Sequence, residues 1–146
     1  MSHEISQSNS YVALNDIGLV RYDHFVHRLF KSGAACGDLV HAAMGISGES
    51  GELLDAIKKH VVYGKVLDKE NVIEELGDLL FYVQAMMNLL EIPEQRVLQH
   101  NADKLQARYK DMAYSDKAAQ DRLDKKVQLS NSSILGMDDT AGLEEK

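Results

Sequence analysis

The sequence predicts an all-α fold, and three observations lead to this prediction. Alanine, leucine, glutamate, lysine and glutamine, which favour helices, dominate residues 38–126. The chain holds a single proline and few runs in which β-branched and polar residues alternate, so the usual signals of a sheet are missing. Apolar residues return instead every three or four positions, as they do along one face of a helix. We therefore expect a four-helix core bundle followed by a short extra C-terminal helix.

Capping residues set the expected helix boundaries. Asp16, Asp38 and Ser115 are suited to N-cap positions, and Pro93 is suited to the first turn of a helix. Breaks in the apolar periodicity separate the helices from one another. The expected helices cover residues 16–31, 38–64, 69–91, 93–112 and 115–126.

One domain is expected, because 146 residues with 45% hydrophobic content suffice for one core and are too few for two. This domain should cover residues 16–126. Residues 1–15 are polar and rich in serine and asparagine, so we expect a flexible N-terminal arm. Residues 127–146 carry several acidic groups and few apolar ones, and we expect a disordered acidic tail there.

The net charge of −7 argues against nucleic-acid polymers as partners, since the basic residues are scattered among acidic ones. No stretch reaches the roughly 18 consecutive apolar residues of a membrane span. Cys36 is the single cysteine, which fits a reducing compartment, and the polar first residues lack an apolar signal core. We therefore expect a cytoplasmic protein that has no membrane partner.

Four carboxylates are the candidate metal ligands. Glu49 and Glu52 are three residues apart, as are Glu75 and Asp78, so each pair projects from one face of its helix. The two helices are consecutive and should be antiparallel, which lets the pairs face each other around a cation. Acidic pairs also occur by chance as solvated surface charges. Clustered like charges on otherwise apolar helices call for a cation, however, and hard oxygen ligands favour Mg²⁺, with Mn²⁺ as a substitute.

Hydrolysis of a phosphoanhydride is the chemistry that such a site suits, because it needs neutralised oxygens, a positioned water and a base. A ferritin-like di-iron site also uses inward carboxylates, but it pairs glutamate with a histidine three residues on. Neither Glu49 nor Glu75 has that histidine. Gly48, Gly51 and Gly77 flank the acids and clear space for a ligand.

These motifs and their order resemble those of a known family. An E-x-x-E pair and an E-x-x-D pair are separated by 22 residues (53–74). The shared phrases are DLVHAAMG (38–45), GISGESGELLDAIKK (45–59), ENVIEELGDLLFYV (70–83), NADKLQARY (101–109) and YSDKAAQDRLDKK (114–126). Over residues 16–126 this set resembles the MazG-like branch of the all-α nucleoside triphosphate pyrophosphohydrolases, in its short, often phage-encoded form.

The resemblance implies Mg²⁺-dependent hydrolysis of (deoxy)nucleoside triphosphates between the α- and β-phosphates, which yields the monophosphate and pyrophosphate. The four carboxylates would hold the metal. The catalytic candidates are Glu52, as the residue that orients the attacking water, and Glu49. The resemblance also implies a homodimer or homotetramer whose sites can combine residues of two chains. For a phage-encoded protein the location would be the host cytoplasm.

Six polar side chains are candidate substrate contacts: Asn101, Lys104, Arg108, Lys59, Lys65 and His41. The first three recur at i, i+3 and i+7, so they share one face of a helix. They match a family phrase whose polar groups reach phosphate or sugar, and a solvated helix face is the competing interpretation. The other two lysines follow the first acidic pair and are candidates for phosphate. His41 lies two turns before that pair, where it can line a base pocket with Tyr82, Met44 and Phe81. A place in the core is the competing interpretation, and we expect it for Met44 and Phe81.

Arg122, Asp124 and Lys125 match the family segment after the Arg-Tyr pair, and a charged surface helix is the competing interpretation. Lys110 stands where many relatives have proline, so the preceding helix can continue. Three rival functions stay open: a dUTP- or dCTP-restricted pyrophosphatase, a phosphoribosyl-ATP pyrophosphohydrolase, and a non-catalytic nucleotide-binding helical module. Nucleobase preference depends on pocket shape, which periodicity does not reveal.

Overall fold

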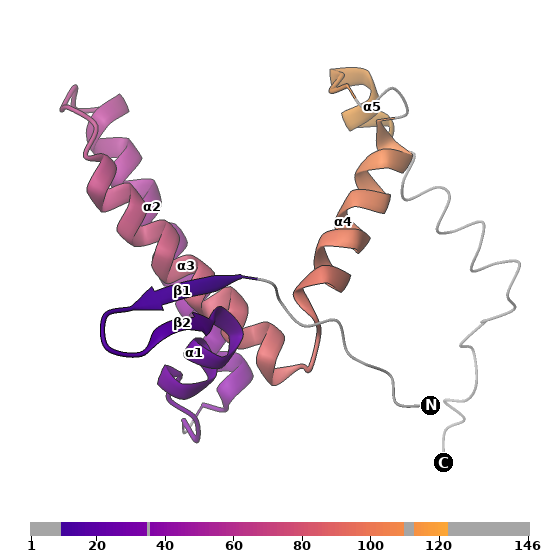
Figure 1. Ribbon diagram of the computed structural model, residues 1–146. Coiled ribbons are helices and arrows are strands. Elements are labelled where there is room, and N and C mark those ends of the chain that lie inside the picture. Colours follow the sequence, from indigo (N-terminus) through magenta and orange to yellow (C-terminus); the bar gives the residue numbers. More distant parts are fainter. Residues whose placement is uncertain (1–9, 35, 110–112, 123–146) are drawn as a thin grey trace, which may run out of the picture. The chain divides into compact units, whose positions relative to one another are not determined.

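The computed structural model describes residues 10–34, 36–109 and 113–122. The chain divides into two compact units, Met1–Val97 and Leu98–Lys146, and each is described by itself (Figure 1). Helices account for most of the described residues, which confirms the predicted all-α class. Within the described ranges, the strands are confined to one short hairpin that precedes the helices.

An antiparallel β-hairpin opens the first unit. β1 (Tyr11–Leu14) pairs with β2 (Gly18–Arg21), and the register places Tyr11 opposite Arg21. Gly18 has a φ of +82°, in the left-handed region that glycine enters without a steric penalty. The hairpin therefore depends on a glycine at the point where the chain leaves the turn.

Two expectations are wrong at this hairpin. The helix predicted over residues 16–31 begins at residue 22, and the arm predicted over residues 1–15 contains β1, while residues 1–9 lie outside the described part of the chain. Asp16 lies in the turn and not at an N-cap. A left-handed residue two positions later cannot continue a right-handed helix, and the β-branched Val12 and Val20, which face each other across the strands, favour extended backbone.

α1 (Tyr22–Leu29) follows β2 directly and packs against α3 (Lys69–Leu89). Val26 on α1 is fully buried and anchors this contact in the core. The Asn88 side-chain amide donates a hydrogen bond to the Asp23 carbonyl at 2.9 Å, which ties the first turn of α1 to the last turn of α3. This packing places the N-terminal segment beside the C-terminal half of α3.

α2 (Asp38–Val61) and α3 run side by side and form the most extensive helix contact of the first unit (Figure 1). Both lie close to the predicted ranges because local signals set their ends. Asp68 caps α3 as its carboxylate accepts the Asn71 backbone N–H at 3.1 Å. Gly64, with a φ of +65°, lies in the connection that follows α2.

The start of α2 differs in one detail from the prediction. Gly37 occupies the N-cap with a φ of +85°, and Asp38 is the first helical residue. The Asp38 carboxylate instead reaches backward and accepts the backbone N–H groups of Gly33 and Ala34 at 2.7 and 3.1 Å. Asp38 therefore fixes the preceding loop, and its negative charge also suits the helix N-terminus.

Small residues bring α2 and α3 close together. Ala42, Ala56 and Ala85 are buried. At Gly45, the Tyr82 ring lies so close that an added methyl carbon would sit 2.3 Å from ring atom Cδ1. This glycine is therefore required by the approach of the two helices, because any larger residue would push the ring away.

The described part of the second unit consists of most of α4 (Glu94–Arg108), which follows Pro93 as expected, and α5 (Asp116–Asp121). Ser115 caps α5 as predicted, with its Oγ accepting the Ala118 backbone N–H at 3.2 Å. α5 stops at Asp121 because the next residue adopts a left-handed conformation. The predicted continuations into residues 110–112 and 123–126, and the predicted tail, lie outside the described residues.

Candidate metal centre

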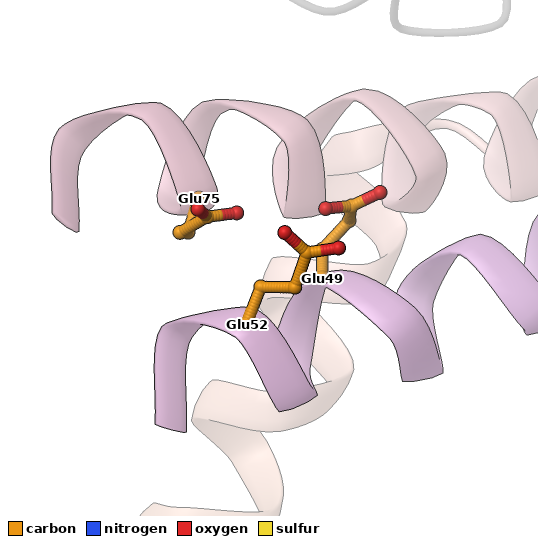
Figure 2. Close-up of side chains that lie close together, drawn as sticks. All are labelled: Glu49, Glu52 and Glu75. Atoms are coloured by element: carbon orange, nitrogen blue, oxygen red, sulfur yellow. The ribbon is translucent and has the colours of Figure 1, made fainter. Parts of the chain in front are cut away.

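Three glutamates converge between α2 and α3. Glu49 and Glu52 lie one turn apart on α2, and Glu75 lies on α3. Each offers one carboxylate oxygen, and these oxygens all lie within 4.8 Å of one another. Figure 2 shows the side chains pointing toward one another from the facing helices. We call these three residues the carboxylate cluster.

Asp78, the fourth predicted ligand, lies one turn after Glu75 on α3 and belongs to the surroundings of the cluster. Its carboxylate is not among the three that share the 4.8 Å limit. Its charge nevertheless helps to raise the pKa of Glu49, so the two groups are within electrostatic reach. The structure thus brings three predicted ligands together and leaves Asp78 beside them.

The electrostatics of the cluster favour a bound cation. The pKa of Glu49 is raised, first by desolvation and then by the negative charges of Glu52, Asp78 and Glu75. Neither the ion pair of Arg21 with Asp23 nor that of Lys59 with Asp55 includes a member of the cluster. Among the described residues, these mutually repelling oxygens form no ion pair with a basic side chain, which fits a divalent metal ion, and hard oxygen donors suit Mg²⁺ or Mn²⁺.

Exposure differs strongly among the three glutamates. Glu75 is buried, with 8% of its surface exposed, whereas Glu49 is half-buried and Glu52 is exposed. Glu75 also accepts a hydrogen bond at 2.7 Å from the side-chain amide of Asn71, one turn earlier on α3. The cluster therefore has a fixed, buried side on α3 and an accessible side on α2. Sequence reasoning missed Asn71, although its i, i+4 spacing to Glu75 was readable.

Tyr22 is a second residue that sequence reasoning missed. It is the first residue of α1, and its pKa is raised by burial and then by the negative charge of Asp78. Its phenol therefore lies within electrostatic reach of the site. No local signal could have shown this, because the proximity arises from the packing of α1 on α3.

The two lysines predicted as phosphate contacts are placed differently. Lys59 lies in the last turn of α2, and its Nζ pairs with Asp55 Oδ2 at 3.0 Å. Its pKa is raised first by that pair, and the charges of Glu75 and Asp68 add to the effect. Lys65 lies in the following loop, where its backbone N–H donates to the Lys59 carbonyl at 3.2 Å. The charge of Lys59 thus interacts with a member of the cluster, Glu75.

His41 lies against aromatic rings at the other side of the cluster. Its ring centroid is 4.9 Å from that of Phe30 and 6.1 Å from that of Tyr82. Phe81 meets Tyr82 edge to face and is half-buried. The expectation that Met44 belongs to the core is wrong, because 63% of its surface is exposed. Val40, one turn before Met44, is exposed as well, so the described residues leave this side of α2 uncovered.

Asn101, Lys104 and Arg108 share a face of α4, in the unit that is described separately from the cluster. Lys104 and Arg108 are half-buried, and Asn101 is exposed. The Arg108 guanidinium lies 6.0 Å from the Tyr109 ring centroid. Their contact with a substrate stays a prediction. Of the later candidates, Arg122 follows α5, whereas Asp124 and Lys125 lie outside the described residues.

The fold and the cluster together define an all-α protein with a site able to hold a metal ion. Residues 41–113, half of the chain, match the model of the MazG nucleotide pyrophosphohydrolase domain. The chain therefore belongs to this family, and the resemblance drawn from its motifs is confirmed.

One relative comes from a bacteriophage. The Gene 37 protein of Mycobacterium phage L5 is 37% identical to the chain over 75 residues, which are 48% of this chain and 65% of the relative. The chain thus covers slightly less than two thirds of that protein. No solved structure matches the chain. Among the described residues, every helix is too short or too polar to cross a membrane.

Proposed function

We propose that this protein hydrolyses nucleoside or deoxynucleoside triphosphates to the monophosphate and pyrophosphate, with Mg²⁺ as its metal ion and Mn²⁺ as a substitute. The observation that carries the proposal is the convergence of Glu49, Glu52 and Glu75, which form no ion pair among the described residues, in a member of a nucleotide pyrophosphohydrolase family. Asp78 would complete the ligand set. When bound, the cation neutralises charge on the cluster and on the triphosphate.

The exposure of the glutamates supports a division of roles. Buried Glu75 and half-buried Glu49 hold the metal, and exposed Glu52 is the one that water reaches most readily. In the reaction one water molecule adds across the bridge between the α- and β-phosphates and one P–O bond of that bridge breaks. Glu52 would orient this water and accept its proton, and Glu49 is the second candidate for that role.

The arrangement along α2 supports an orientation for the nucleotide. His41 lies eight residues before Glu49, so at about 1.5 Å per residue it is about 12 Å away along the same face of the helix. Its aromatic surroundings suit a planar base. Lys59 lies in the opposite direction and suits a phosphate. We assign the same kind of contact to Lys65 and the α4 residues Asn101, Lys104 and Arg108.

A homodimer or homotetramer is part of the proposal, because the first unit taken by itself leaves a large apolar surface on α2 and α3 uncovered. Val26 is the one large side chain that is fully buried among the described residues. Exposed apolar residues follow helical spacing on the outer faces of both helices: Val40, Met44, Leu54 and Val61 on α2, and Ile73, Leu76 and Leu80 on α3. A second copy of the chain would cover these faces and convert two helices into a bundle.

Glycines on these outer faces leave room for such a neighbour. An added methyl group at Gly48, Gly51 or Gly77 would meet no described atom within 4 Å. We expect Leu54→Arg to shift the molar mass in solution, measured by light scattering, toward the monomer. Val66→Arg is the control, since Val66 is 94% exposed in the loop after α2 and should leave the mass unchanged. A monomeric wild type at micromolar concentration would contradict the oligomer.

A panel of nucleotides with Mg²⁺ tests the reaction and separates it from its rivals. We expect monophosphate and pyrophosphate in equal amounts. Turnover of dUTP or dCTP alone would favour a restricted pyrophosphatase, and preference for phosphoribosyl-ATP would favour that related hydrolase. Release of inorganic phosphate from the γ position would exclude cleavage between the α- and β-phosphates. Nucleotide binding with no product from any substrate would favour a non-catalytic binding module.

The location of the reaction is also a proposal. The phage origin of one relative supports the cytoplasm of a bacterial host, where nucleoside triphosphates are made. The acidic net charge of −7 supports small nucleotides over nucleic-acid polymers as ligands.

A further inference from the structure

Asn71 contacts the carboxylate cluster but has no part in the proposed reaction. It precedes Glu75 by one turn of α3, and its amide Nδ2 donates to Glu75 Oε1 at 2.7 Å. We propose that Asn71 is a positioning residue that orients the Glu75 carboxylate for a divalent cation. This inference rests on the proposed metal centre and adds a residue to it that carries no charge of its own.

The choice of donor supports this role. A lysine or arginine in the same place would pair with Glu75 and compete with the cation, whereas a neutral amide orients the carboxylate and leaves its charge available. A carboxylate has two oxygens, so accepting the amide at Oε1 still leaves Oε2 for a metal. Hydrogen bonds to ligating carboxylates commonly act in this way at metal sites.

Asn71 is itself held in place at the start of α3. Its backbone N–H donates to the carboxylate of the N-cap Asp68 at 3.1 Å, and its side chain is half-buried. A continuous chain of hydrogen bonds therefore runs from the helix cap through Asn71 to Glu75, the most buried member of the cluster. Glu75 is thus oriented before a cation arrives, while Glu52 on the exposed side is free to adjust.

Metal binding by Asn71→Leu tests the proposal directly. Leucine keeps the backbone N–H that Asp68 caps and removes only the side-chain donor. We expect Mn²⁺ binding to the full chain without nucleotide, followed by electron paramagnetic resonance, to weaken about 10- to 100-fold, the usual effect of losing such a partner. Asn71→Gln, which keeps an amide that can reach Glu75 along the helix, should stay within about threefold of the wild type.

Gln99→Leu is a matched control. The Gln99 side-chain amide donates to Asp103 Oδ1 at 2.7 Å. Like the Asn71–Glu75 bond, this bond joins an amide to a carboxylate four residues later, but it lies on α4. Its loss should leave Mn²⁺ affinity unchanged. Circular dichroism would show that all variants are folded and that their melting temperatures are similar. If Asn71→Leu is unfolded, the folded Asn71→Gln and an Asn71→Ser variant, which cannot reach Glu75, provide the same comparison.

The outcomes separate a positioning role from a merely structural one. The inference would be overturned if Asn71→Leu bound Mn²⁺ as tightly as the wild type, or if Gln99→Leu lost as much Mn²⁺ affinity as Asn71→Leu. It would also be overturned if a folded Asn71→Gln bound Mn²⁺ as weakly as Asn71→Leu. With nucleotide, the Mg²⁺ concentration for half-maximal rate should rise while kcat at saturating Mg²⁺ stays within about twofold. If the wild type binds Mn²⁺ but hydrolyses no nucleotide, the proposed reaction is wrong and the role of Asn71 still stands. If the wild type binds no Mn²⁺, both proposals are wrong.

Discussion

Two neighbouring stretches of the α2–α3 pair are packed in opposite ways. Around Gly45, the Tyr82 ring fills the space between the helices, and His41 continues the aromatic contact. One turn further along α2, three carboxylates face one another instead, and burial raises the pKa of one of them. The aromatic stretch packs within the chain alone, whereas the acidic stretch gathers like charges that a bound cation would neutralise. Substitutions should therefore act on stability in the first and on metal-dependent chemistry in the second.

The largest effect is expected from Glu52→Gln. If Glu52 orients and deprotonates the attacking water as we propose, its loss should lower the rate of pyrophosphate release by about 10²- to 10⁴-fold. The melting temperature without metal should not fall, because one of several repelling charges is removed. Glu74→Gln is the control, since Glu74 is an exposed acid next to Glu75 and should keep full activity. A Glu52→Gln enzyme within tenfold of the wild type would show that another group acts on the water.

Metal binding should stabilise the acidic stretch. Mg²⁺ at 100 times its dissociation constant should raise the free energy of unfolding of the wild type by about 2.7 kcal/mol, because the unfolded chain does not assemble the cluster. Thermal unfolding with and without Mg²⁺ measures this. Glu75→Gln should show a clearly smaller gain, because it removes the most buried of the proposed ligands. Equal gains in both proteins would mean that the cation binds elsewhere.

The aromatic stretch should respond to Gly45→Ala with a loss of stability. The new methyl carbon would lie 2.3 Å from the Tyr82 ring, and relieving such a clash costs about 1–3 kcal/mol. Denaturant unfolding measures the loss, and KM for nucleotide should rise more than kcat falls, because the ring lines the proposed base end. In Gly48→Ala the new methyl meets no facing side chain of the described residues within 4 Å, so this variant should lose less stability than Gly45→Ala. Equal behaviour of the two variants would disprove the close approach.

The same contrast explains what could be predicted from the sequence. The carboxylate cluster and the bounds of α2 and α3 depend on spacing within a helix and on a local cap such as Asp68, which one sequence displays. The β-hairpin was missed because its apolar residues also fit a helical spacing. The left-handed conformation of Gly18 favours the hairpin over the helix. The placement of Tyr22 near Asp78 requires α1 to pack on α3, and no local pattern encodes that contact.

The smallest effect is expected at the exposed end of the acidic stretch, where Asp55 holds Lys59. An exposed ion pair adds little to stability, so Asp55→Asn should leave the melting temperature nearly unchanged. It should, however, release Lys59 for the triphosphate and lower KM about two- to threefold, whereas Lys59→Met should raise KM several-fold. Lys58→Met is the matched control, because the Lys58 Nζ lies 5.7 Å from the centre of the Tyr63 ring and pairs with an aromatic face. If the two lysine variants have the same KM, the phosphate contact belongs to a residue other than Lys59.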